Sequence, residues 1–195
     1  LMLSLEERIE HLERDLTADP IKISAYHDLP FAILRYHPEE EFQVRKQIAL
    51  FVIRLENAGK RVHVISLARL MWRAVKETEE IEGLVAVEKS MGFQRAQETL
   101  SVILSDDAFM PLSTMLEEEL KRLDPKVDVV FLVRVGALAP AIYRSAKLLD
   151  EMYGRTMVPM ILLYPGTLEG DRGLRFMDLP GRGDTGAYNY RVRIY

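Results

Sequence analysis

The side chains best suited to chemistry in this sequence stand where apolar segments end, and most of them are arginines. If those segments are parallel strands, their carboxyl ends meet at one edge of a sheet, where α/β proteins bind ligands. A rim rich in cations and poor in carboxylates suits an anionic partner or a nucleotide better than hydrolysis. The candidate anion- or partner-binding residues are Arg35, His37, Ser66, Arg134, Tyr164, Arg175 and Arg191.

Motifs that would turn this rim into an active site are missing from the sequence. The phosphate loop G-x-x-x-x-G-K-[ST] and the nucleophile elbow G-x-S-x-G do not occur. Gly181, Gly183 and Gly186 match G-x-G-x-x-G by letters, but no predicted helix follows them, so we interpret them as a surface loop. Ser66 and His37 remain the candidates for a degenerate hydrolase, with helix capping and turn packing as the alternatives.

Metal and cofactor chemistry also lacks a sequence signal. The histidines, at positions 11, 27, 37 and 63, share no metal-ligand spacing, and the chain has no cysteine. His63 lies within an apolar segment, where a hydrogen-bonded structural histidine is the expected role. We therefore expect no metal, no cofactor and no enzymatic activity.

Arg134 interrupts an apolar segment near its end, and two interpretations stay open. A buried guanidinium is costly unless it is paired. Arg134 therefore either bonds an internal carboxylate and helix-end carbonyls or emerges at the rim to meet an anionic partner.

Apolar patterning predicts an α/β fold with a mostly parallel central sheet flanked by helices. Residues 127–166 predict a strand, a helix over 137–152 and a second strand, as in a parallel βαβ unit buried on both faces. A second unit has strands at 31–36 and 61–67 around a helix at 39–58. That helix is apolar almost all round at 48–53, which predicts burial on two sides. A last strand at 190–195 is expected at or near a sheet edge.

The organisation predicted is a single α/β domain over residues 1–195. Residues 1–19 form an amphipathic helix that begins with a Ser4–Glu7 capping box and carries one apolar stripe, which docks on its own domain or on a partner helix. Residues 68–123 are an all-helical insertion between the second and third strands, serving as a subdomain, a lid or a docking face. Residues 166–189 form a glycine-rich loop region. The stripe consists of Leu5, Ile9, Leu12 and Leu16.

Composition is that of an ordinary soluble protein, with 48% hydrophobic and 29% charged residues. No apolar stretch approaches the roughly 18 residues of a membrane span, and the absence of cysteine fits a reducing cytoplasm. With 26 basic and 30 acidic residues, the whole surface is not expected to coat nucleic acid, although a local basic patch remains open.

Several segments together resemble the BrxB family of BREX (bacteriophage exclusion) defence systems. The likeness is most specific in the C-terminal third, and the departure is the glycine-rich loop at 181–186, where the resemblance leads us to expect an acidic or polar turn. The resemblance covers nearly the whole chain. The segments are HDLPFAILRYHPEEEFQVR, VHVISLA, LVRVGALAPAIYRSAKLLDEM, VPMILLYPGTLEG, LRFMDL and YNYRVRIY.

The resemblance implies a non-enzymatic core or accessory component of a phage-defence complex, distinct from its methyltransferase, ATPase and phosphatase-like components. Other BREX proteins are the implied partners, with the phosphatase-like PglZ first and DNA reached through the complex. The N-terminal stripe and the helical insertion are the expected docking surfaces, and a homodimer through the N-terminal helix is open. The alternative is a nucleotide- or nucleic-acid-binding module that uses the basic rim.

Overall fold

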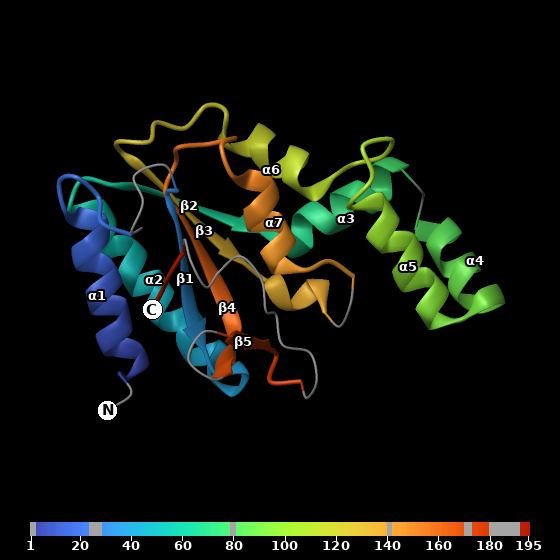
Figure 1. Cartoon of the computed structure of the whole chain (residues 1–195), viewed down its shortest axis with the longest axis horizontal. Coiled ribbons are helices and arrows are strands. Elements are labelled where there is room, and N and C mark those ends of the chain that lie inside the picture. Colours follow the sequence, from blue (N-terminus) through green and yellow to red (C-terminus); the bar gives the residue numbers. More distant parts are fainter. Residues whose placement is uncertain (1–2, 24–28, 79–80, 140–141, 170–172, 180–191) are drawn as a thin grey trace.

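A computed structural model describes residues 3–23, 29–78, 81–139, 142–169, 173–179 and 192–195 (Figure 1). Parallel strands in the order β2-β3-β4-β1-β6 form the sheet, and β5 pairs antiparallel with the end of β4. The α/β class and the mostly parallel sheet are confirmed. The strands are β1 (Phe31–Tyr36), β2 (Arg61–Ser66), β3 (Asp128–Val133), β4 (Met160–Glu169), β5 (Gly173–Phe176) and β6 (Arg193–Ile194).

Helices α1 (Leu5–Thr17) and α2 (Glu41–Asn57) cover one face of the sheet (Figure 1). Ser4 caps α1 in the predicted capping box with Glu7. All four apolar residues of the α1 stripe are at most 5% exposed and pack in the same core cluster as the strands. The stripe therefore docks on its own domain, the first of the two alternatives, and its apolar residues are not exposed to a partner helix.

The opposite face is covered by α3 (Leu67–Thr78), α6 (Leu112–Leu120) and α7 (Ser145–Met152). The insertion predicted between the second and third strands is helical, as expected, but α3 and α6 belong to the main core. Helices α4 (Ile81–Met91) and α5 (Phe93–Ile103) form a hairpin that projects away from the sheet (Figure 1). Gly92, with φ of 89°, makes the tight turn between them because glycine tolerates a positive φ.

The helix predicted over 137–152 is shorter than expected. Residues Val135–Leu138 form a 3₁₀ turn, η2, and α7 begins only at Ser145. Ala139 has an extended backbone, with ψ of 156°, as the residue before a proline prefers. The prediction of one continuous helix over 137–152 is therefore wrong.

Helix α2 also departs from its prediction, because it is buried on one side only. Val44, Ile48, Phe51 and Leu55 face the core. Its other apolar residues are exposed, at 75% for Phe42, 59% for Leu50 and 53% for Ile53. Within the described ranges α2 packs on the sheet and beside α1, and no element covers its outer side.

The C-terminus completes the sheet, as predicted, at the edge beside β1. Tyr195 donates its N–H to the Ile33 carbonyl at 2.8 Å and accepts from the Arg35 N–H at 3.1 Å. Its hydroxyl donates to Asp15 of α1 at 2.6 Å. The start of the predicted glycine-rich region is instead the β4–β5 hairpin, where a Cβ on Gly166 would lie 2.2 Å from the Arg175 carbonyl oxygen. The loop at 181–186 lies outside the described residues.

Among the helices that the structure describes, none combines the length and the apolar content needed to cross a bilayer.

Candidate functional site

The carboxyl ends of the parallel strands hold two predicted site residues in capping roles. Ser66 ends β2, and its hydroxyl accepts the Arg69 N–H at 3.3 Å at the start of α3. His37 follows β1, and its Nδ1 accepts the Glu39 N–H at 3.4 Å at the turn Pro38–Glu40. Both contacts match the capping and turn alternatives foreseen for these side chains.

The other predicted rim residues do not form a bare cationic patch. The Arg175 guanidinium lies 2.9 Å from Glu169 and 3.9 Å from Asp178, and the bond to Glu169 raises the pKa of Arg175. Tyr164 is fully buried against Phe176, with ring centroids 5.4 Å apart. Arg35 is half-buried, and burial lowers its pKa while nearby Glu40 raises it. Arg191 lies outside the described residues.

Arg134 is the rim residue with the geometry expected of a recognition site. Its side chain is exposed, and in the described part of the chain it has no ion pair or side-chain hydrogen bond. The structure therefore favours the rim interpretation over an internal pair. Its backbone is left-handed, with φ of 64° and ψ of 33°, which costs a non-glycine residue about 1 kcal/mol or more. Strain of this kind is often kept at functional sites.

Arg134 borders an apolar groove of about 260 Å³ between α2 and the sheet. Its floor comes from strands β2, β3 and β4 and from the inner side of α2. At the mouth, Glu41 accepts from the Tyr36 hydroxyl and pairs with Arg45 at 2.8 Å. Burial raises the pKa of Glu41, but the bonds from Tyr36 and Arg45 and the positive charges of Arg45 and Arg134 lower it overall. The apolar floor consists of Val44, Ile48, Ala49, Val52, Val64, Val133 and Leu163.

Beside the groove, the side of α2 that faces away from the sheet carries exposed apolar side chains, which we call the α2 surface together with Val64 at the groove. It comprises Phe42, Leu50 and Ile53 of α2 together with Val64 of β2, which is 49% exposed. β2 is also an end strand of the sheet, so one row of its backbone groups has no neighbouring strand among the described residues. Sequence patterning pointed to this surface through the all-round apolar stretch 48–53, but it wrongly assigned both sides to the core.

The charges beside the α2 surface include two cations without an ion pair within the described ranges, Lys46 and Arg134, and the exposed Glu56 of α2. Lys46 lies on the exposed side of this surface. Arg45 and Arg54 are neutralised by Glu41 and Glu13, at 2.8 and 2.7 Å. A partner segment that combines apolar and acidic side chains would complement this arrangement.

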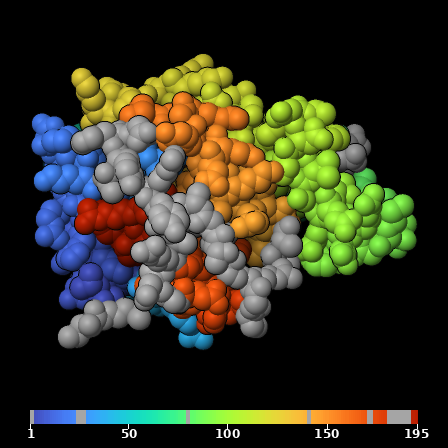
Figure 2. Space-filling model, viewed as in Figure 1, coloured from blue at the N-terminus to red at the C-terminus, as the bar shows by residue number. Residues whose placement is uncertain are grey.

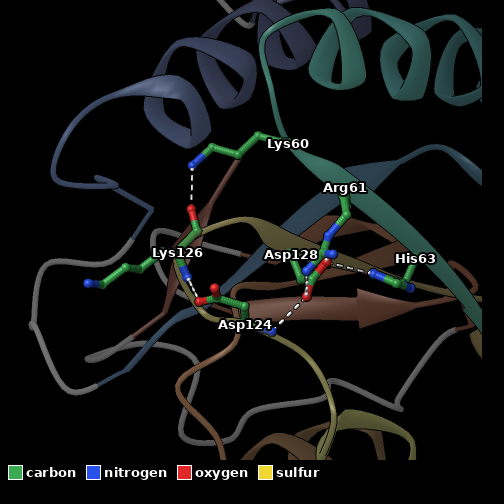
Figure 3. Close-up of polar contacts among 6 residues, drawn as sticks. All are labelled: Lys60, Arg61, His63, Asp124, Lys126 and Asp128. Atoms are coloured by element: carbon green, nitrogen blue, oxygen red, sulfur yellow. Dashed lines mark hydrogen bonds and ion pairs between the residues drawn. The ribbon is translucent and has the colours of Figure 1, made fainter.

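The amino ends of β2 and β3 hold a polar cluster around the buried side chain of Asp128 (Figure 3). The Asp128 side chain is 1% exposed and accepts two bonds from Arg61, at 2.8 and 2.9 Å. It also contacts His63 Nε2 at 2.9 Å and accepts the Asp124 N–H at 2.6 Å. The cluster fastens the start of β2 to the start of β3, and the structural role predicted for His63 is confirmed.

This cluster and the hollow near it lie at the amino ends of the strands. The hollow, about 760 Å³ in volume, is bordered by Lys60 and Lys126, which Figure 3 shows joined by a hydrogen bond from Lys60 Nζ to the Lys126 carbonyl at 3.1 Å. The groove bordered by Arg134 lies at the carboxyl ends of the strands, where open parallel sheets bind ligands, so we place the candidate site at this groove and the α2 surface beside it. In the described residues, no group of three or more His, Asp or Glu side chains is arranged to hold a metal ion.

Comparison with known proteins decides the family. A family model described as BREX protein BrxB matches residues 63–194. The chain belongs to the BrxB family. It is similar to a BREX protein BrxB from Bacillus cereus (strain H3081.97), with 26% identity over 149 residues that cover 73% of each chain. No solved structure matches.

Family membership makes the chain a BREX phage-defence component and confirms the predicted resemblance. The matched range begins within β2 and includes the helical insertion, β3, β4 and the C-terminus. Helices α1 and α2 precede it, so the α2 surface combines one strand inside the matched range with a helix before it.

Replacing Asp128 by Asn should lower the free energy of unfolding by about 1–3 kcal/mol at pH 7, because the donors around its buried side chain lose a charged acceptor. Burial raises the pKa of Asp128, but bonds from Asp124, His63 and Arg61 lower it overall from 3.8. The wild type therefore keeps this contribution above pH 3.8 and loses it as the pH falls through the lowered pKa. Urea unfolding between pH 2 and 7 should show that loss in the wild type and not in Asp128→Asn. Exposed Asp107→Asn is the control, and an equal effect of both variants would contradict the assignment.

Replacing Arg134 by Gly should raise the free energy of unfolding by about 0.5–1 kcal/mol, because glycine adopts the left-handed conformation without steric cost. Arg134→Ala keeps the unfavourable φ and should stay close to the wild type. Urea unfolding measures both. If Arg134→Gly were less stable than the wild type by more than about 1 kcal/mol, the guanidinium would be making a structural contact.

Proposed function

We propose that this BrxB-family protein is a non-enzymatic component of a BREX complex that binds another BREX protein through the α2 surface. One observation supports this most strongly: α2 carries a second apolar stripe that its own fold leaves exposed. The stripe adjoins both an apolar groove and Arg134, a strained and unpaired cation.

The physical argument for a protein partner rests on the apolar area. Burying a fully exposed leucine, isoleucine or phenylalanine stabilises a contact by roughly 1.5–3 kcal/mol. Phe42, Leu50 and Ile53, spread along about three turns of α2, form the kind of exposed patch that marks interaction sites on soluble proteins. Arg134 and Lys46 would then select a partner segment that carries acidic side chains.

PglZ is the partner we propose first, on the strength of the family resemblance, with DNA reached through the assembled complex. A direct nucleic-acid role is less well supported, because Arg175 is ion-paired with Glu169. Fewer free cations at the rim mean fewer phosphate contacts and weaker electrostatic binding.

Replacing Leu50 by Glu should reduce co-purification of PglZ at least tenfold, because a charged group left without a partner in an apolar contact costs several kcal/mol. Leu50 is 59% exposed, so the fold should survive and the thermal midpoint should change little. The measurement is capture of untagged PglZ by the tagged chain in cells carrying the BREX operon.

Leu3→Glu, at a leucine that is 42% exposed and lies outside the α2 surface, is the matched control. Full capture of PglZ by Leu50→Glu would remove the α2 surface from the proposal. A wild-type chain that captures none of the BREX proteins would contradict the proposed function itself.

A further inference from the structure

Helix α4 has an apolar sequence but no buried residue. Ile81 and Val85 are 39% and 40% exposed, and Met91, at the end of the helix, is 68% exposed. Figure 2 shows the hairpin of α4 and α5 standing out from the rest of the molecule. Of the described elements, α5 is the main one packed against α4. A short helix draws most of its stability from packing, and α4 leaves several of its apolar side chains largely exposed.

The two faces of α4 are distinct. Half-buried Leu84 and Val87 lie on the side toward α5. Glu82, Val85 and Lys89 are exposed, and spacings of three, four and seven residues place them together on the outer face. Neither Glu82 nor Lys89 has an ion pair within the described residues.

We propose that this outer face binds the same face of a second copy of the chain, with the two α4 helices antiparallel. A two-fold axis beside Val85 and Ala86 places Glu82 of each copy opposite Lys89 of the other. One acidic and one basic residue lie at equal distances on either side of the axis, so two ion pairs form. This reciprocal arrangement is the self-complementarity that an isologous contact requires.

Apolar contacts fit the same arrangement. Val85 and Ala86 are small, so the helix axes can approach within about 8–10 Å. Eleven residues span only about 16 Å, so the interface is small. We therefore expect a weak dimer, with a dissociation constant on the order of 10–100 µM.

This contact does not depend on the proposed function. The α2 surface and the α4–α5 hairpin lie on opposite sides of the sheet (Figure 1), so one chain can contact both a BREX partner and a second copy. A dimer would present two α2 surfaces and could bind two partner molecules.

Charge-reversal variants test the proposal. Sedimentation velocity measures dimerisation of the whole chain at concentrations from about 5 to 300 µM. We expect the wild type to dimerise across this range. Glu82→Lys and Lys89→Glu should each weaken dimerisation at least tenfold, because each creates two like-charge contacts. The double variant restores opposite charges and should return to within about threefold of the wild type.

Two further variants keep the result decisive. Glu118→Lys, at an exposed glutamate of α6, makes the same change in net charge and should leave dimerisation unchanged. Val85→Glu should abolish the dimer while circular dichroism stays that of the wild type. A wild type that is monomeric at 300 µM, a dimer insensitive to Glu82→Lys, or a double variant no better than the single ones would each overturn the proposal.

Discussion

A parallel sheet must be covered on both faces, and the way this chain meets that requirement explains most of its surface. Three helices bury one face, and α1 and α2 bury the other. The crossover from β1 to β2 passes over two intervening strands, and α2 alone makes it. Its inner side completes the core, but no described element lies beyond it. The apolar residues on its outer side are therefore left to solvent or to a partner.

The amino and carboxyl ends of the parallel strands differ in how fully their charged side chains are paired. At the amino ends, the Asp128 carboxylate contacts Arg61, His63 and the Asp124 N–H. These contacts suit a permanent structural link between β2 and β3. At the carboxyl ends, Arg134 is strained and exposed beside a groove. A saturated cluster stabilises the fold, whereas an unsatisfied cation beside apolar surface remains available for binding.

Local patterns in the sequence were enough to predict β1 at 31–36 and the capping box at Ser4, because both depend on neighbouring residues. The sidedness of α2 was not predictable in this way, since it depends on how many elements the tertiary fold places around the helix. The same holds for Arg175, whose partner Glu169 is found only once β4 continues into a hairpin with β5. The burial of Tyr164 likewise follows from packing against β5. The later start of α7, by contrast, was predictable from the sequence, because the residue before a proline such as Pro140 disfavours the helical conformation.

The central claim is that the outer side of α2 and the open edge of β2 are where a BREX partner binds. Hydrogen–deuterium exchange, read by mass spectrometry with and without saturating PglZ, tests it most directly. The account predicts at least about tenfold slower exchange in Arg61–Ser66, with additional protection in Glu41–Asn57, when the complex forms. A complex that forms while exchange in both segments stays unchanged would contradict it.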